Sequence, residues 1–274
     1  MTRSRGGCVQ IVGIGPGGED ELSLGALRAI QSAEELWMLD LGPPTQERFF
    51  LRKWLKGKAK VVNVYGYYLI PDCPREVFYE LMARRILHLA KKGRRITLLS
   101  SGNPLIWVSG TDLFKQWAGS IPVRIIPSMS FLDTIFLKTP FSCGELQLRL
   151  TGVTDPDISP ELDCLVGQVA DDGTSDLSSP SAARSFFSAL RRFYSNNHPA
   201  YIIGNHSIYG EAKLRTTTVG LLSASIREFI GWHYSILLPS VKRARALKGQ
   251  ADHSGPLNVS RRFAGSGRAS GRRG

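Results

Sequence analysis

The residues that decide the fold read VQIVGIGPGG at positions 9–18, and a segment with apolar residues at helical spacing (22–33) follows them. The apolar run predicts a buried strand, the glycines predict a tight turn, and the next segment predicts a helix. Gly13, Gly15 and Gly18 satisfy the G-x-G-x-x-G spacing of dinucleotide-binding units. On the pattern alone, this strand–turn–helix unit predicts a nicotinamide or flavin site.

The residues directly after the glycine turn argue against a dinucleotide. Glu19, Asp20 and Glu21 occupy the expected start of the helix. A pyrophosphate at a helix N-terminus needs free N–H groups and the positive end of the helix dipole, and three carboxylates there repel a dianion. The sequence therefore favours a cationic ligand at this turn, or a ligand without phosphate.

Strand-like and helix-like segments alternate along the chain, which is typical of a mainly parallel sheet covered on both faces. The expected strands are 9–14, 35–39, 60–65, 96–99, 123–126, 162–169, 200–203 and 234–238. The expected helices are 22–33, 75–92, 131–136, 181–193 and 219–229. Because the pattern restarts after residue 120, we predict two α/β domains, 1–118 and 119–240, and a separate tail, 241–274.

The composition is that of an ordinary globular protein. Of the 274 residues, 42% are hydrophobic and 21% are charged, which excludes wholesale disorder. No apolar run approaches the roughly 18 to 20 residues that span a bilayer. The four cysteines and five histidines show no metal-binding spacing. We therefore expect a reduced, cytoplasmic protein without a metal site.

Much of the net charge of +12 lies in the tail. Residues 241–274 hold nine Lys or Arg against one Asp, a net charge of +8, which leaves +4 for residues 1–240. The tail is also rich in Gly and Ser, so we predict that it is disordered. RNA binding through this tail is the alternative interpretation.

Four blocks of sequence resemble, in order, the tetrapyrrole methylase superfamily. They are the opening stretch 12–30, the Gly-Asn-Pro loop with Ser-Gly (102–110), the Pro-Ser-Met-Ser turn (127–130) and the strand 165–168. The resemblance implies two α/β domains that hold S-adenosylmethionine in the cleft between them, and a homodimer. The cofactor-binding residues that it implies are Gly102, Asn103, Pro104, Ile106, Val108, Ser130, Phe131, Gln168, Asn205 and Thr217.

Within that superfamily the chain most resembles the borosin-type enzymes, which methylate backbone amide nitrogens of a ribosomally made precursor peptide. Arg75 and Tyr79 open a long helix as R-x-x-x-Y, and Tyr-Gly lies just upstream at position 65. The segments 143–149 (CGELQLR) and 163–169 (DCLVGQV) also resemble this branch. The tail has no apolar core peptide, so the resemblance implies the split form, which acts on a separate peptide.

The chemistry of amide methylation explains why these residue types belong together. An amide nitrogen is a poor nucleophile, so methylation needs proton removal and tight alignment with the sulfonium methyl group. A spacing of four places Arg75 and Tyr79 one turn apart on one helix face, where a cation can stabilise an ionised phenol or a developing oxyanion. We predict Arg75, Tyr79, Tyr65 and Tyr68 as catalytic residues, with one tyrosine of 65–68 facing the site.

The chain departs from the family pattern at two positions. Ser101 precedes the Gly-Asn-Pro block, where borosin enzymes often carry tyrosine, and Ser128 replaces the usual glycine in the turn 127–130. Other acceptors stay open at this point. Within the superfamily they are ribosomal RNA ribose and a tetrapyrrole. From another class, the alternative is a non-catalytic member that binds a peptide or RNA.

Overall fold

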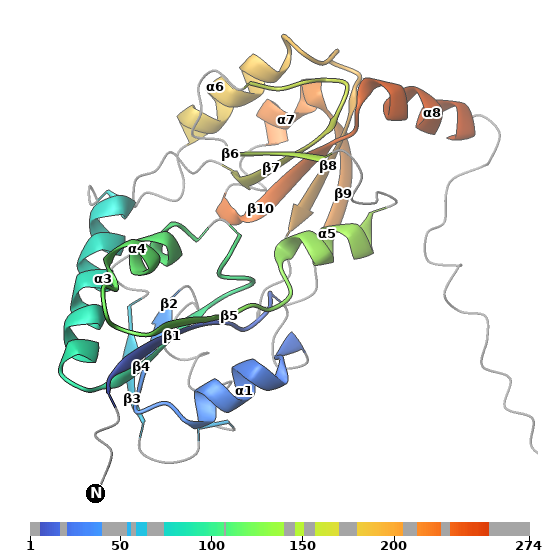
Figure 1. The fold of residues 1–274 in the computed structure, drawn as a ribbon. Helices are drawn as coiled ribbons and strands as arrows, with labels where there is room; N and C mark the ends of the chain where they lie inside the picture. The colour runs from blue at the N-terminus through green and yellow to red at the C-terminus, as the bar shows by residue number, and fades with distance from the viewer. Residues whose placement is uncertain are drawn as a thin grey trace, which may run out of the picture.

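The computed structural model describes residues 6–16, 21–39, 54–55, 59–64, 74–106, 108–139, 146–150, 157–169, 180–204, 213–225 and 231–251. These residues form two separate five-stranded sheets with helices packed on them (Figure 1). The predicted α/β class is confirmed. The predicted residues Tyr65, Tyr68 and Asn205 lie outside the described residues.

The first sheet is entirely parallel, with the strand order β3-β2-β4-β1-β5. Its strands are β1 (Cys8–Gly13), β2 (Glu35–Leu39), β3 (Lys60–Asn63), β4 (Arg95–Ser100) and β5 (Val123–Ile126). Because all five run the same way, their carboxyl ends meet at one edge. The expected strands in this half of the chain are confirmed, with ends that differ by one or two residues.

Helices cover both faces of the first sheet because the side chains of β1 alternate between them. Val9 and Ile11 pack with α3 (Arg75–Lys91) and α4 (Ser109–Trp117), whereas Val12 packs with α1 (Leu24–Gln31) on the opposite face. Figure 1 shows α1 on one side of the sheet and α3 with α4 on the other. Helical periodicity predicted α3 to within one residue.

The second sheet has the order β6-β7-β10-β8-β9 and is mainly antiparallel. The pair β6–β7 is parallel, and the other three pairs are antiparallel. The predicted parallel arrangement is therefore wrong for this half of the chain, because strand–helix alternation does not fix strand direction. The strands are β6 (Leu146–Leu150), β7 (Asp163–Val169), β8 (Pro199–Gly204), β9 (Lys213–Thr218) and β10 (Gly231–Leu238).

Helices also cover the second sheet on two sides. A cluster with Phe186 and Phe187 joins α6 (Pro180–Leu190) and α7 (Val219–Ser225) to the sheet. A second cluster joins Ile135 of α5 (Phe131–Lys138) to Leu165, Ile203 and Leu237. In Figure 1, α5 follows β5 of the first sheet and lies against the second sheet.

Two predicted boundaries are wrong. The domain boundary at 118/119 falls before β5, yet β5 pairs with β1 and forms an edge of the first sheet. The tail predicted to be disordered from 241 begins with a helix, α8 (Val241–Ala251). Its N-terminus is fixed by Asp163, whose Oδ1 accepts a hydrogen bond from the Ser240 N–H at 2.7 Å. Residues 252–274 lie outside the described residues.

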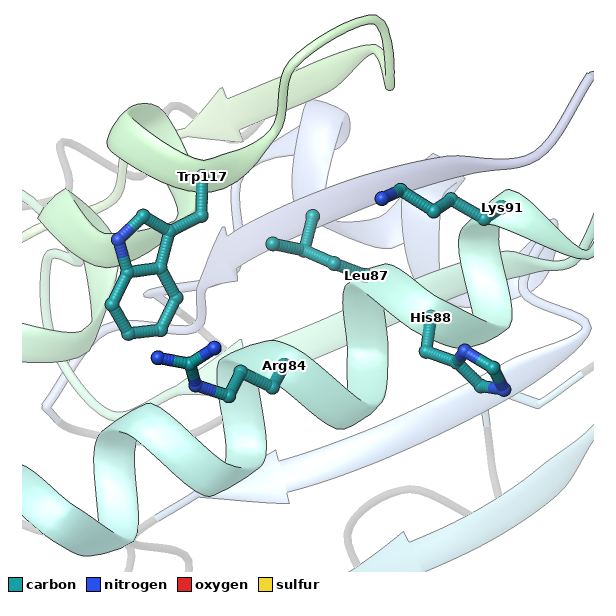
Figure 2. Close-up of a pocket in the computed structure, with 5 residues that line it drawn as sticks. All are labelled: Arg84, Leu87, His88, Lys91 and Trp117. Atoms are coloured by element: carbon teal, nitrogen blue, oxygen red, sulfur yellow. The ribbon is translucent and has the colours of Figure 1, made fainter.

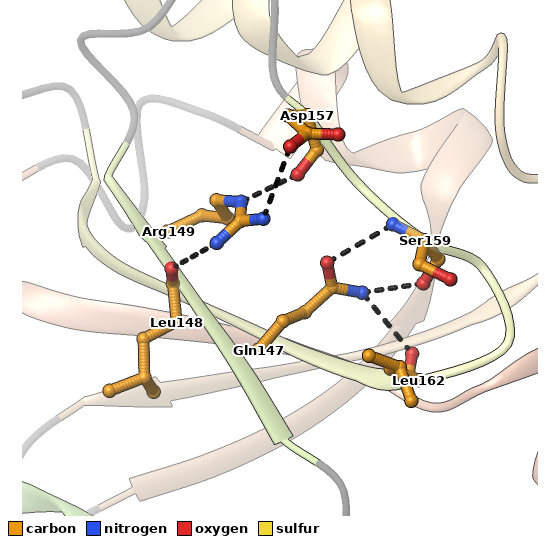
Figure 3. Close-up of polar contacts among 6 residues, drawn as sticks. All are labelled: Gln147, Leu148, Arg149, Asp157, Ser159 and Leu162. Atoms are coloured by element: carbon orange, nitrogen blue, oxygen red, sulfur yellow. Dashed lines mark hydrogen bonds and ion pairs between the residues drawn. The ribbon is translucent and has the colours of Figure 1, made fainter.

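The block 146–149, which carried part of the resemblance to the peptide methylases, fixes the edge of the second sheet (Figure 3). Gln147 donates a hydrogen bond to the Ser159 carbonyl, and its Oε1 accepts from the Ser159 N–H at 3.1 Å. Arg149 donates to the Asp157 carbonyl at 2.6 Å. These contacts hold the chain that leads into β7 against the edge strand β6, so the block has a structural role.

No helix among the described segments is long and apolar enough to cross a membrane.

Candidate functional site

The strand order places the candidate site at the carboxyl edge of the first sheet, between β1 and β4. The chain leaves β1 through α1 toward β2, and it leaves β4 through α4 toward β5 in the opposite direction. The two connections run over opposite faces of the sheet. Open parallel sheets bind ligands at such a point. The glycine turn after β1 and the Gly-Asn-Pro loop after β4 both lie there.

These loops are in direct backbone contact. The Gly102 N–H donates a hydrogen bond to the Gly15 carbonyl at 3.0 Å, and the two glycines form an isolated antiparallel bridge. A Cβ on Gly13 would lie 2.6 Å from the Gly102 carbonyl oxygen and 2.7 Å from Cδ of Pro104. Gly13 is therefore required for close packing of the two loops, not for a free approach of ligand to the backbone.

The turn after β5 joins the same arrangement. Ser128 Oγ donates to the Glu21 carbonyl at 3.3 Å. A Cβ on Gly13 would also lie 3.0 Å from Cβ of Ser128, so this turn packs on the end of β1. The structure thus brings together three of the four sequence blocks that carried the family resemblance. Each block follows a parallel strand, and parallel strands end at one edge.

Glu21 occupies the place where a dinucleotide phosphate would be expected. A Cβ on Gly15, whose φ is +75°, would lie 2.6 Å from Oε2 of Glu21, so this carboxylate lies against the glycine turn. The expectation that Glu21 begins the helix is wrong, because α1 begins at Leu24 with Ser23 as its N-cap. The argument against a pyrophosphate therefore rests on this contact and not on the helix dipole.

The loop after β4 is held by its own hydrogen bonds. Asn103 Oδ1 accepts from the Leu105 N–H at 3.0 Å, and Thr111 Oγ1 donates to the Pro104 carbonyl at 2.7 Å. Gly102 has φ +68°, and a Cβ there would meet nothing within 4 Å. The loop is thus rigid, while the Gly102 backbone faces open space that a ligand can enter.

Ser130 is accounted for by helix capping. Its Oγ accepts from the Leu132 N–H at 3.2 Å, and its own N–H donates to Oδ2 of Asp133 at 2.6 Å, which completes a capping box at the start of α5. The side chain is buried. Phe131 is half-buried and packs toward the second sheet. Ser130 holds α5 at the junction of the two sheets, and a role in donor binding stays a prediction.

Tyr79 lies beside the Gly-Asn-Pro loop but within the core. The side chain is 6% exposed and packs in the cluster shared by α3 and α4. A Cβ on Gly110 would lie 2.7 Å from Cδ1 of Tyr79, so the ring rests on the first turn of α4. Arg75 is the first residue of α3, at the carboxyl edge of the sheet, and the structure describes its backbone alone. Their catalytic roles stay predictions.

The remaining residues predicted to bind the cofactor lie partly in a loop of the first sheet and partly in strands of the second. Ile106 and Val108 are half-buried in the loop after β4. Gln168 is in β7, where the structure describes the backbone alone, and Thr217 is in β9 opposite Ala200. Thr217 belongs to a strand that periodicity did not predict, because its sequence KLRTTT is polar.

Two exposed apolar side chains at this edge escaped the sequence argument. Leu105 is 54% exposed and Met129 is 38% exposed. They lie in the loops after β4 and β5, beside residues that the family pattern singled out. Each therefore presents an exposed apolar side chain at the carboxyl edge of the first sheet. The sequence offers a signal only for Met129, which lies between Ser128 and Ser130, whereas Leu105 is followed by the apolar residues 106–108.

The chemistry of these loops suits S-adenosylmethionine. The stretches 13–21, 100–108 and 126–131 contain no lysine or arginine and include three acidic residues. Such loops oppose a phosphate and suit a sulfonium cation. The open backbone at Gly102 and the half-buried Ile106 and Val108 suit the uncharged adenosine part. The residues present therefore fit this cofactor.

Comparison with known proteins gives siroheme synthases among the relatives of this chain. The siroheme synthases of Thioalkalivibrio sulfidiphilus and Neisseria meningitidis serogroup B are 28% and 29% identical over 130 and 135 residues. These matches cover 47% and 46% of this chain but 25% and 24% of the relatives, so the chain matches about a quarter of their length.

Solved structures share the fold. Uroporphyrin-III-C-methyltransferase from Thermus thermophilus has a TM-score of 0.64 at 18% identity, with 89% of this chain and 98% of that chain covered. A cobalt precorrin-4 methyltransferase has a TM-score of 0.58 at 17% identity, with 87% and 97% covered. At these identities the likeness concerns the fold.

The sequence model of the tetrapyrrole (corrin/porphyrin) methylases matches residues 9–221, which include both sheets up to α7. The loops that this match contains are those that meet at the carboxyl edge of the first sheet. The chain therefore belongs to the tetrapyrrole methylases, a family of S-adenosylmethionine-dependent methyltransferases.

Proposed function

We propose that this protein transfers a methyl group from S-adenosylmethionine to a tetrapyrrole. Family membership supports the donor and the reaction type. The observation that carries the proposal is the backbone bridge between the glycine loops after β1 and β4, at the edge of the sheet where Leu105 and Met129 are exposed. A tetrapyrrole macrocycle has broad apolar faces, which such side chains contact well.

The cofactor supplies an electrophilic methyl group on a sulfonium. The protein's own part is to hold that group in line with the acceptor atom and to exclude water from both. The hydrogen-bonded loop of Asn103 and Thr111 provides a rigid support for this alignment. Leu105 and Met129 cover the acceptor on its apolar face.

Calorimetric titration with S-adenosylmethionine, followed by incubation with uroporphyrinogen III and labelled donor, tests the proposal. We expect saturable donor binding and transfer of label to the macrocycle. Leu105→Ser with Met129→Ser should weaken acceptor binding and leave donor binding unchanged. Donor binding without transfer to uroporphyrinogen or to corrin precursors would contradict the tetrapyrrole acceptor.

A peptide amide is the second candidate acceptor, and the position of Tyr79 favours it. Its ring rests on Gly110, next to the Gly-Asn-Pro loop, and Arg75 begins the same helix one turn earlier. In this interpretation Tyr79 takes the amide proton or orients the residue that does, while Arg75 stabilises the imidate oxygen.

Tyr79→Phe distinguishes a peptide acceptor from a tetrapyrrole acceptor. Phenylalanine keeps the packing on Gly110 and removes the hydroxyl. If a peptide amide is the acceptor, this variant should lose about 10²- to 10⁴-fold in turnover, with donor affinity unchanged. Mass spectrometry of apolar peptides incubated with enzyme and donor provides the readout. Unchanged turnover of the phenylalanine variant would exclude the hydroxyl from the chemistry.

A further inference from the structure

The second half of α3 presents a row of basic side chains to solvent. The exposed basic residues there and at the C-cap are Arg84, Arg85, His88, Lys91 and Lys92. Arg84, His88 and Lys91 follow one another at spacings of four and three, so they share one side of the helix and extend about 10 Å along it. Arg84 pairs with Glu80 at 3.8 Å, but both side chains are largely exposed, so this contact leaves most of the positive charge available to a ligand.

This row borders a hollow of about 250 Å³ between α3 and α4, lined by Arg84, Leu87, His88, Lys91 and Trp117 (Figure 2). The guanidinium carbon of Arg84 lies 4.6 Å from the centre of the Trp117 ring, a cation–π contact that holds the planar group at the hollow. The Arg84 side chain is nevertheless 66% exposed, so a ligand can reach the guanidinium from solvent. Figure 2 shows Leu87 between Arg84 and Lys91. The hollow thus combines a flat cation held on an aromatic ring, an apolar floor and a second cation.

The hollow lies away from the bridged glycine loops. α3 ends at Lys91, shortly before β4 begins, and α4 ends at Trp117, shortly before β5 begins. Both helix ends are therefore near the amino edge of the first sheet, whereas the loops after β1 and β4 lie at its carboxyl edge. A ligand in the hollow would thus occupy a site distinct from the candidate methyl-transfer site.

We propose that this hollow binds one nucleotide of a single-stranded nucleic acid, whose neighbouring phosphates lie along the cations of α3. A base stacks on the exposed side of the Arg84 guanidinium, since guanidinium planes and aromatic rings are the platforms on which unpaired bases stack. Lys91 and Lys92 attract the phosphates. An acidic peptide would use the same charge but would leave the guanidinium that is held on Trp117 without a flat partner.

The size of the hollow favours one unit of a chain over a free small molecule. Its volume of about 250 Å³ is below the roughly 300 to 1,000 Å³ of pockets that enclose a whole small-molecule ligand. The basic side chains also continue past the hollow, to Arg85 and Lys92. This binding function does not depend on which molecule accepts the methyl group.

Fluorescence anisotropy of a labelled oligouridylate of about 12 nucleotides, titrated with the full chain between about 50 and 200 mM salt, tests the role of charge. We expect saturable binding that weakens as salt rises. Arg84→Gln/Lys91→Gln should weaken it about tenfold and lower the slope of log affinity against log salt by about 1.4, since each phosphate contact of a single strand contributes about 0.7. Arg28→Gln/Arg124→Gln, at exposed cations of α1 and β5, is the matched control and should change neither quantity. Both variants keep the basic C-terminal residues, and circular dichroism with donor binding establishes that each is folded.

Arg84→Lys tests stacking apart from charge, because lysine keeps the positive charge and lacks the planar group. We expect this variant to bind oligouridylate about fivefold more weakly or worse, with the salt slope of the wild type. It should bind an abasic strand of the same length as well as the wild type does. Equal losses on both strands would contradict a stacked base.

Four further outcomes would overturn the proposal. The wild type would fail to bind oligouridylate at the lowest salt concentration, or the hollow variant and its control would lose equal affinity, which would assign binding to net charge alone. Polyglutamate of equal charge would bind as tightly as oligouridylate, which would assign the face to an acidic protein. Uridine monophosphate would bind as tightly as the oligonucleotide, which would assign the hollow to a free nucleotide.

Discussion

The two sheets have the same number of strands, but the segments at their edges are held in different ways. In the first sheet the loops contact each other through their backbones. Gly15 and Gly102 form a β-bridge, and a Cβ on Gly13 would clash with the loop after β4. In the second sheet, side chains make the connections: Gln147 and Arg149 fix the edge strand, and Asp163 holds the start of α8.

The difference follows from strand direction. Parallel strands bring several loops to one edge, where only glycine permits close approach, and the loops then leave backbone available for a ligand. In an antiparallel sheet neighbouring loops alternate between edges, so side chains must fix each connection separately. Substitutions of the contacts named above should therefore affect ligand binding in the first sheet, and stability alone in the second.

The largest effect on donor affinity is expected for Gly13→Ala. The added methyl group would lie 2.6 Å from a backbone oxygen and 2.7 Å from a proline ring, so the loops must separate, at a cost of about 3 kcal/mol. Urea unfolding measures the loss of stability, and calorimetry measures a parallel loss of donor affinity.

Two other glycines provide the controls for this substitution. Gly7→Ala clashes with the Ala90 carbonyl at the amino edge, so it should lower stability but leave the donor affinity of the folded protein intact. Gly6→Ala meets nothing within 4 Å and should change neither. Equal donor affinity in all three variants would show that S-adenosylmethionine does not bind at the bridged loops.

Between pH 8 and pH 10.5, the buried Cys164 of the second sheet should lower the free energy of unfolding by about 2 kcal/mol. Burial raises the pKa of the Cys164 thiol from 9.0 to about 12. The unfolded thiol ionises first as pH rises, so the free energy of unfolding is unaffected below pH 9 and falls between pH 9 and 12, by about 1.4 kcal/mol per unit. Burial raises the pKa values of Tyr194 and Tyr201 in the same direction.

Urea unfolding at pH 8 and pH 10.5 measures this slope. Cys164→Val removes the titrating group at similar volume, so its unfolding free energy should depend less on pH over this interval. An unchanged slope in the valine variant would assign the alkaline loss of stability to the two tyrosines.

The sequence predicted the first sheet better than the second, for a physical reason. Each strand of the first sheet is a short apolar run separated by a helix or by turn residues, so hydrophobic patterning alone locates it. In the second sheet, β6 and β9 are edge strands with polar residues, and LQLRL and KLRTTT do not form apolar runs. The threonines of β9 are followed directly by α7, so a polar run of this kind is also compatible with a helix cap.

The candidate site was predictable in its loops but not in its side chains. Glycines that permit close backbone approach appear directly in the sequence, which is why the turns at Gly13 and Gly102 were found. The position of Tyr79 depends on packing across two helices, and its contact with Gly110 has no local signal. Leu105 and Met129 are recognisable as exposed only when the turns that carry them are folded.

A smaller effect, about 1 to 2 kcal/mol, is expected for Asp163→Ala. The substitution leaves the Ser240 N–H without its acceptor and removes a negative charge from the N-terminus of α8. Hydrogen exchange of the α8 amides should quicken, with donor affinity unchanged. Arg243→Ala removes the 3.2 Å ion pair of Asp163 at a cation that is 35% exposed, so it should cost less. An equal cost for both would assign the stabilisation to the ion pair.

The smallest effect tests Ser130, which lies where the chain passes from the first sheet to the second. Ser130→Ala and Asp133→Ala each break the capping box of α5, so each should cost about 1 kcal/mol in urea unfolding. If capping is the whole role of Ser130, both variants should bind S-adenosylmethionine equally well. If Ser130 also contacts the donor, as the family resemblance implies, only its variant should lose affinity. Matched stability makes the difference in affinity a direct measure of that contact, because both variants perturb the same helix terminus.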